Sequence, residues 1–289
     1  MYYLDLLVNG LINGCMYALM AMGLTMVYGL LRILHIAHAV IFTLGAFTGV
    51  VVANETGSLW IAFPAAILVS VIAGILVYRV IYQPLLKHPP FVALIASLGV
   101  LLILEDGFRI IFGENGISFR HNPYFLNTMD FLGIRLNQTQ VALVITTIVL
   151  LGVLYIFLER TRIGVGWRAT EANPRMAISF GVNVLTVRYI NFAIGSAIAG
   201  IAGVLVALLN NFVEPSFGAV VSYKALAIIV LGGLGSTRGA LIASLLLGVA
   251  ESFGTIALGD YLDRDAIAAL VLIVILMIRP QGLGAKAAA

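Results

Sequence analysis

The sequence has few charged residues and almost no cysteine. Only 10% of its 289 residues are Asp, Glu, Lys or Arg, whereas a soluble globule carries roughly a quarter. The single cysteine, Cys15, excludes an intrachain disulfide and a thiolate metal cluster. Apolar residues make up 62% of the chain, and the mean hydropathy is +1.09. Such a chain could not bury its apolar surface in water, so the composition indicates a membrane protein.

The charges that are present also exclude other classes of function. The formal net charge is +3, and the cations are scattered at the ends of apolar runs rather than gathered into a phosphate-binding patch. No nucleic-acid partner is therefore expected.

There is no His and carboxylate metal cluster, and no Ser or Cys nucleophile beside an evident base, so we expect neither an enzyme nor a metal site. The glycine-rich segment 232–239 lacks the Gly-Lys-Ser/Thr ending of a phosphate-binding loop and is interpreted as a tight reversal between two half-helices.

Apolar runs repeat along the whole chain. A membrane-spanning helix needs roughly 20 mostly apolar residues. The sequence therefore predicts an all-α, polytopic transmembrane bundle of about eight or nine segments, some of them broken helices. The run at 219–236 contains Lys224, and the last run is short. The runs fall at 6–31, 36–53, 60–82, 91–112, 139–158, 187–210, 219–236, 239–258 and 262–278.

Two longer polar segments separate these runs. Segment 159–186 is rich in Arg, and Lys and Arg mark the cytoplasmic side of a membrane protein. We therefore expect 159–186 to be cytoplasmic and 113–138 to form an extracytoplasmic lid. If all nine runs span, the N-terminus lies outside and the C-terminus inside. Because no linker divides the chain, residues 1–289 are predicted to form a single transmembrane domain.

Small residues recur at a spacing of four within several runs. Helices in lipid lack a hydrophobic force that draws them together, so close backbone approach through small residues has to contribute. These ridges are interpreted as helix-packing surfaces. They are Gly10, Gly14 and Ala18; Gly45, Gly49 and Ala53; and Gly195, Ala199 and Gly203.

Polar side chains form a stripe beside the first ridge. Asn9, Asn13 and Tyr17 lie four residues apart, and three polar groups on one helix face do not favour lipid. They either form hydrogen bonds to other helices or line a water-filled path for the substrate, and the sequence leaves both interpretations open. Weaker candidates for the same substrate path are Thr25, Thr43, Thr48, Ser97, Asn191 and Ser196.

Charged residues inside the runs need partners. Glu105 and Asp106 are spaced to pair with Arg109 on one helix. Glu251 has no cation within reach on its own segment, so it is predicted to be protonated or paired with another helix, as a structural tie or as a wall of the substrate path. Lys224 is expected to snorkel toward the outer surface.

Two further segments contain informative residues. His35 and His38 are interpreted as a polar junction at a helix break, because two His residues without a carboxylate or thiol nearby are weak evidence for a metal site.

Within 159–186, Asn173 can cap a helix that starts at Pro174 and stops at Gly181. A short amphipathic helix in a cytoplasmic loop is either a docking element or a helix in the headgroup region.

Several segments, in order along nearly the whole chain, resemble one family. They are Gly23–Ile33, His35–Ala39, Gly164–Gly181, Phe192–Leu205, Leu231–Ala240 with Gly248 and Glu251, and Arg279–Leu283. The chain resembles the LivH-type permeases of branched-chain amino acid ABC transporters. Such ordered agreement is more specific than any single motif.

The resemblance implies an ABC importer permease fold and a set of partners. These are a LivM-like second permease, two cytoplasmic ATPase subunits and an extracytoplasmic solute-binding protein, in the cytoplasmic (inner) membrane of a prokaryote. The ATPases would use ATP, and this chain would need no cofactor. The loop implied to couple to the ATPases contains Gly164, Arg168, Glu171, Pro174, Arg175, Ala177 and Gly181.

The solute and the mechanism are predicted more coarsely. The expected function is import of branched-chain or other small neutral amino acids by alternating access. The alternatives are urea, amides or aromatic acids, or a secondary transporter driven by an ion gradient. We also expect the helices to be broken at 32–39 and 219–236, near the solute path, since both segments combine weak hydropathy with distinctive residues.

Overall fold

The computed structural model describes residues 2–120, 128–131, 134–257, 261–279 and 281–284. Parts of the predicted lid 113–138, the end of the run 239–258, Pro280 of the C-terminal motif and the tail 285–289 lie outside these ranges. The helices and strands follow in chain order. They are α1 (Tyr2–Leu31), α2 (His38–Thr56), α3 (Leu59–Val77), η1 (Tyr78–Tyr82), α4 (Gln83–Leu85), α5 (Pro90–Phe112), β1 (Ile117–Ser118), β2 (Thr128–Phe131), β3 (Ile134–Asn137), α6 (Gln138–Arg160), α7 (Arg162–Ala172), α8 (Pro174–Ser179), α9 (Val184–Asn210), β4 (Phe212–Val213), α10 (Phe217–Gly232), α11 (Thr237–Ala257) and α12 (Arg264–Ile278).

The described residues form a helical membrane bundle, as the sequence predicts. Seven helices are long and apolar enough to cross a bilayer, counting α3, η1 and α4 as one. The helix α10 has 16 residues, which gives it a length of about 24 Å, less than the ~30 Å hydrocarbon core. The last helix, α12, has 15 residues. Together these elements agree with the predicted eight or nine segments.

The helices divide into a buried centre and an apolar exterior. The apolar windows of α1 and α9 are 78% and 72% buried, whereas those of α5 and α6 are each 17% buried. Large apolar side chains are exposed on the outer helices, among them Trp60 and Ile110. An exposed surface of this kind is stable in lipid and unfavourable in water.

Glycines bring the central helices into backbone contact. A Cβ placed on Gly14 of α1 would lie 2.8 Å from the Cα of Leu245 in α11, and one on Gly45 of α2 would lie 2.5 Å from the Cα of Gly200 in α9. A Cβ on Gly203 would meet the Phe42 carbonyl oxygen. These contacts confirm that the predicted ridges are helix-packing surfaces.

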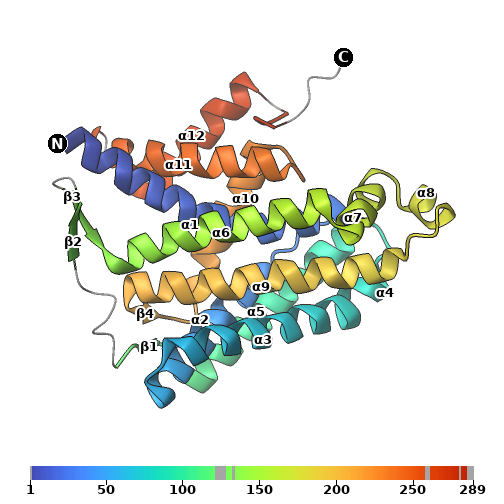
Figure 1. The fold of residues 1–289 in the computed structure, drawn as a ribbon, viewed down its shortest axis with the longest axis horizontal. Helices are drawn as coiled ribbons and strands as arrows, with labels where there is room; N and C mark the ends of the chain where they lie inside the picture. Colours follow the sequence, from blue (N-terminus) through green and yellow to red (C-terminus); the bar gives the residue numbers. More distant parts are fainter. Residues whose placement is uncertain (1, 121–127, 132–133, 258–260, 280, 285–289) are drawn as a thin grey trace.

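The two ends of the bundle differ in structure. Figure 1 shows the N-terminus and the β2–β3 hairpin at one end and α7 and α8 at the other. At the first end, β1 pairs with β4, and the Asn54 side chain fixes the strand by donating to Ser118 O (2.9 Å) and accepting from Arg120 N (2.8 Å). The predicted lid is therefore attached to the segment that joins α9 to α10.

The predicted break at 32–39 is confirmed, whereas 219–236 is broken only at its end, because α10 is continuous to Gly232. The first helix ends at Leu31, Arg32 has a φ of 54°, and α2 begins at His38 after a junction, residues 32–37. Residues 233–236 reverse the chain between α10 and α11, and Gly233 and Gly235 have φ angles of 91° and 86°. This confirms a tight reversal between helices. That the breaks adjoin a solute path stays a prediction.

Candidate functional site

The segment 159–186 contains two helices that project from one end of the bundle. Thr161 caps α7 by accepting a hydrogen bond from Gly164 N at 3.0 Å. Asn173 caps α8 by accepting from Arg175 N (3.0 Å) and Met176 N (3.2 Å), and Pro174 is the first helical residue. Gly181 has a φ of 81°, which a residue with a side chain rarely adopts. The predicted helix start and stop are confirmed.

The predicted coupling residues on α7 hold this helix against the rest of the chain. Arg168 donates to the carbonyl oxygen of Leu158 and forms an ion pair with Glu159 at 3.4 Å. A Cβ on Gly164 would meet the carbonyl oxygens of Phe157 and Leu158, so only glycine fits against the end of α6. These residues orient α7, which positions α8.

The predicted residues on α8 lie at the tip of the projection. Ala177 is buried, whereas Arg175 and Gly181 are exposed and Pro174 is half-buried. The exposed apolar side chains at this tip are those of Met176, Ile178 and Phe180. The six-residue helix α8 and its C-cap residue Phe180 together expose three large apolar side chains and a cation, which suits contact with another protein or the headgroup region.

Sequence reasoning missed a buried link between this projection and the bundle. The Trp167 indole N–H donates to the Asn191 side-chain oxygen at 2.8 Å, and the Asn191 amide donates to the Met26 carbonyl at 3.2 Å. The link joins α7, α9 and α1. Asn191 was predicted to line the substrate path; here its buried amide holds three helices together.

Glu171 lies at the base of the projection, beside a cavity of 490 Å³. The cavity is also lined by the reversal between α10 and α11 and by Gln281. Burial raises the pKa of the half-buried Glu171 carboxyl, and the Arg32 guanidinium opposes this rise. Glu171 thus connects the coupling segment to the two helix interruptions.

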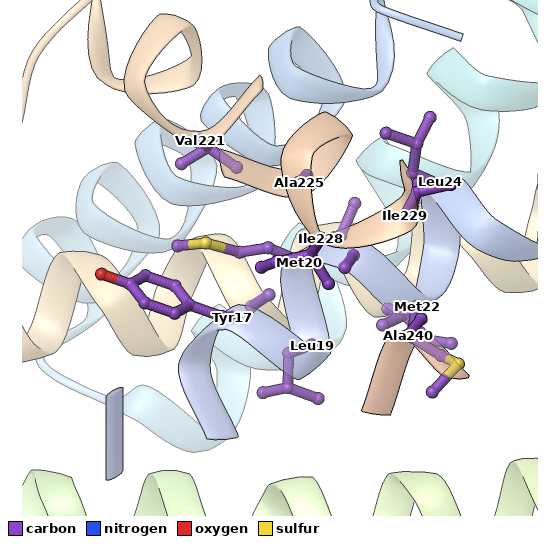
Figure 2. Close-up of a cluster of buried hydrophobic side chains, with 14 of the residues drawn as sticks. Tyr17, Leu19, Met20, Met22, Leu24, Val221, Ala225, Ile228, Ile229 and Ala240 are labelled. Atoms are coloured by element: carbon purple, nitrogen blue, oxygen red, sulfur yellow. The ribbon is translucent and has the colours of Figure 1, made fainter. Parts of the chain in front are cut away.

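The predicted path residues Tyr17 of α1 and Glu251 of α11 meet where these two helices pack together. The Tyr17 hydroxyl donates to Glu251 Oε2 at 2.5 Å, and Lys224 Nζ lies 3.0 Å from the same hydroxyl and 3.3 Å from Glu251 Oε1. Figure 2 shows Tyr17 within a cluster of apolar side chains that α1 and α10 contribute. Glu251 is therefore paired with another helix, one of the two states predicted for it.

The position of Lys224 corrects an expectation. Lys224 was expected to snorkel to the outer surface, but its side chain is only 8% exposed. Because α10 packs between α1, α11 and α12, Lys224 reaches carboxylates on neighbouring helices sooner than lipid headgroups. Its partners Glu251 and Asp265 are far away in the sequence, and the only hint of them was a cation inside an apolar run.

The other predicted path residues do not form one site. Thr25, Thr43 and Thr48 donate to carbonyl oxygens four residues earlier in their own helices, and Ser97 donates to one three residues earlier. Such back-bonding satisfies a hydroxyl without a solvent path. Ser196 is buried where α9 meets Gly74 of α3.

Asn9 and Asn13 differ from these residues. Asn9 is exposed and Asn13 is half-buried. Within the described ranges, neither amide has a hydrogen-bond partner. Their role in a wet path stays a prediction.

The remaining polar residues that the sequence singles out differ in their partners. Arg109 pairs with Glu105 at 2.6 Å and with Asp106 at 3.2 Å, as predicted. His35 Nδ1 lies 2.6 Å from the Tyr82 hydroxyl in the buried junction, while neither ring nitrogen of His38 has a partner. In the part of the chain that the structure describes, no group of three or more His, Cys, Asp or Glu side chains could hold a metal ion.

An apolar helical bundle with a capped helical projection at one end is typical of a multi-pass membrane protein. Residues 6–279 match the family described as branched-chain amino acid transport system / permease component, and the chain belongs to this family. The predicted family, and with it a transport rather than an enzymatic function, is thereby confirmed.

Individual relatives agree over almost the full length. The permease protein BraD of the high-affinity branched-chain amino acid transport system of Pseudomonas aeruginosa is 31% identical, over 98% of this chain and 95% of its own. The LivH and LivM permease proteins of Escherichia coli K12 are each 29% identical, over 98% and 92% of this chain and 96% and 67% of their own. One transport system thus contains two permeases similar to this chain.

A solved structure shows the same fold at low identity. PsaBC from Streptococcus pneumoniae in complex with Fab superposes with a TM-score of 0.53 and 14% identity, and covers 96% of this chain and 91% of that one.

Proposed function

We propose that this chain is the permease of an importer for branched-chain or other small neutral amino acids with an apolar side chain. Its relatives are permeases of branched-chain amino acid systems, and the described helices contain few fixed charges, most of them paired. A path of this kind suits a solute without net charge. The proposed location is the inner membrane of a prokaryote, with 159–186 on the cytoplasmic side.

The observation that carries the proposal is the projection formed by α7 and α8. The tip of α8 exposes Met176, Ile178 and Phe180, while α7 is held to the bundle by Trp167 and Arg168. A rigid arm with an apolar tip transmits force from a partner to the helices behind it. The proposed partner at the tip is one of the two ATPase subunits, which use the ATP. A LivM-like permease would form the other wall of the path, and an extracytoplasmic binding protein would deliver the solute.

The geometry of the arm supports the proposed alternating access. Closure of the ATPases would push on α8, and α7 would pass the movement to α9 and α1 through Trp167, Asn191 and Met26. Because the arm ends beside the reversal at 233–236, the same movement would reach α10 and α11. These two helices contain the buried ion pair, Lys224 in α10 and Glu251 in α11.

The test is a reconstitution of the importer from this chain, its second permease, the ATPases and the binding protein in liposomes. Arg168→Glu and Pro174→Gly should leave assembly intact and reduce leucine-stimulated ATP hydrolysis, because they loosen the arm. Arg120→Gln, at an exposed position at the opposite end of the bundle, serves as a control for a change of charge alone. Normal coupling in both arm variants would contradict docking at α8. Leucine uptake by the purified chain alone, without ATP, would contradict the ATP-driven mechanism.

A further inference from the structure

Four charged side chains from three helices close into one network beside the bundle core. Lys224 Nζ of α10 lies 3.3 Å from Glu251 Oε1 of α11 and 3.1 Å from Asp265 Oδ1 of α12. Arg264 Nε, also of α12, lies 3.4 Å from Glu251 Oε2. The Tyr17 hydroxyl donates to the same Oε2 and accepts from Lys224. The network contains two cations and two anions, so its charge is balanced.

The two halves of the network differ in burial. The side chains of Lys224 and Glu251 are 8% and 0% exposed, whereas those of Asp265 and Arg264 are 57% and 48% exposed. The inner half is fixed on two helices of the bundle. The outer half consists of two consecutive residues at the start of α12, a helix of 15 residues. The outer half can therefore leave without unfolding the helices that hold the inner half.

Departure of the outer half would expose a buried ammonium and a buried carboxylate side by side. Together the two are neutral, but each would lose a partner of opposite charge, which is costly in a medium of low dielectric constant. A group that replaces Asp265 and Arg264 must offer a carboxylate to Lys224 and a cation to Glu251. A zwitterionic amino acid carries a carboxylate and an ammonium group on the same carbon atom. Urea and simple amides have neither.

An apolar cavity of 360 Å³ adjoins the network. Lys224 and Asp265 both reach its wall, so a carboxylate bound at Lys224 would have apolar side chains within reach. Small-ligand sites combine an apolar lining with a few placed polar groups. The apolar wall includes Leu226 and Val230 of α10, Leu247 of α11, and Ala268 and Leu272 of α12.

We propose that Lys224 and Glu251 form a binding site for the carboxylate and ammonium of an apolar amino acid, and that α12 occupies this site itself in the present conformation. Asp265 stands in the place of the solute carboxylate and Arg264 in the place of its ammonium, while the cavity takes the side chain. The inference rests on the proposed function for the solute class. Exchange of the Asp265 and Arg264 side chains for the two charges of the solute keeps Lys224 and Glu251 paired, while the rest of α12 still lines the cavity.

Binding of radiolabelled leucine to the importer in nanodiscs, without the binding protein, tests the proposal. The double variant Arg264→Gln/Asp265→Asn should bind leucine about ten-fold more tightly than the wild type, because uncharged side chains no longer compete with the solute charges for Lys224 and Glu251. A gain of affinity cannot arise from misfolding. Asp263→Asn, a neighbour outside the network, is the matched control and should leave the affinity unchanged.

Leucine analogues test the two charges separately. Isoamylamine lacks the carboxylate and 4-methylpentanoate lacks the ammonium, so each should compete at least about ten-fold less well than leucine. Glu251→Gln and Lys224→Gln should abolish the gain when added to the double variant. A double variant that binds leucine no more tightly than the wild type, or analogues that compete as well as leucine, would overturn the site.

The outcomes separate this site from the proposed function. If leucine is transported by the wild type and equally well by Lys224→Gln, the function stands and the site is wrong. If the wild-type importer transports no apolar amino acid, the proposed function fails. A gain of leucine binding in the double variant would then still support the site.

Discussion

Trp167 and Asn191 are joined by a buried hydrogen bond of 2.8 Å between the indole N–H and the side-chain oxygen. The bond connects α7, at the base of the projecting arm, to the largely buried helix α9. The Asn191 amide in turn donates a hydrogen bond to the Met26 carbonyl in α1. A movement of the arm therefore reaches two central helices through a single side chain.

Trp167→Phe should weaken this connection while it keeps the apolar ring. The buried Asn191 oxygen would lose its donor, at a cost of about 1–3 kcal/mol. We expect a lower Tm of the purified chain and fewer solute molecules transported per ATP hydrolysed by the reconstituted importer. Trp60→Phe, at a site that is 91% exposed, is the control and should change neither quantity. An unchanged transport ratio in Trp167→Phe would show that the arm transmits force by another route.

Gly45→Val should destabilise the bundle, because its side chain has no room against Gly200 of α9. Overpacking of a tight interface costs typically about 1–3 kcal/mol. Gly99→Val is the matched control, since Gly99 also lies within a helix and nothing lies within 4 Å of the position of its Cβ. Thermal unfolding in detergent measures both. Equal Tm values for the two variants would contradict backbone contact between α2 and α9.

Asn9 and Asn13 should be reachable from water if they line the predicted path. Because Cys15 is the only cysteine, Cys15→Ser provides a background for labelling. In that background Asn9→Cys and Asn13→Cys should react with a membrane-impermeant maleimide, whereas Thr25→Cys, at a fully buried position, should not. Labelling of Thr25→Cys but not of the two other variants would move the path away from this face of α1.

Glu171→Gln should stabilise the chain near neutral pH. Burial raises the pKa of this carboxyl, so the folded state binds its proton more tightly than the unfolded state does. The folded state is then penalised as the pH rises through the raised pKa, and Gln removes the penalty. The gain in Tm should vanish below the usual carboxyl pKa of about 4.3.

The exposed carboxyl of Glu55 provides the control for this prediction. Glu55→Gln should leave the Tm nearly unchanged at each pH. A Glu171→Gln variant that is less stable than the wild type at neutral pH would show that the attraction between Glu171 and Arg32 outweighs the cost of burial.

The sequence predicts those features of the fold that depend on neighbouring residues. The cap at Asn173, the stop at Gly181 and the pair formed by Glu105 and Arg109 are all encoded within one or two helical turns. The glycine ridges are visible as spacings of four. Even the interruption near His38 follows from a local loss of hydropathy.

Contacts between distant segments could not be predicted in the same way. Lys224 and Glu251 are 27 residues apart, and only the packing of α10 against α11 brings them together. The bond from Trp167 to Asn191 depends on how α7 folds back over α9. For the same reason, hydroxyls such as that of Thr43 were assigned to a path, although the helix itself satisfies them.

The glycine contacts have a mechanical consequence. Helices whose backbones touch, as at Gly14 and Leu245 or at Gly45 and Gly200, cannot slide past each other without large gaps opening between them. Helices α1, α2, α9 and α11 therefore behave as a block that tilts as a whole. In the proposed importer, the passage would then open where this block tilts away from the second permease.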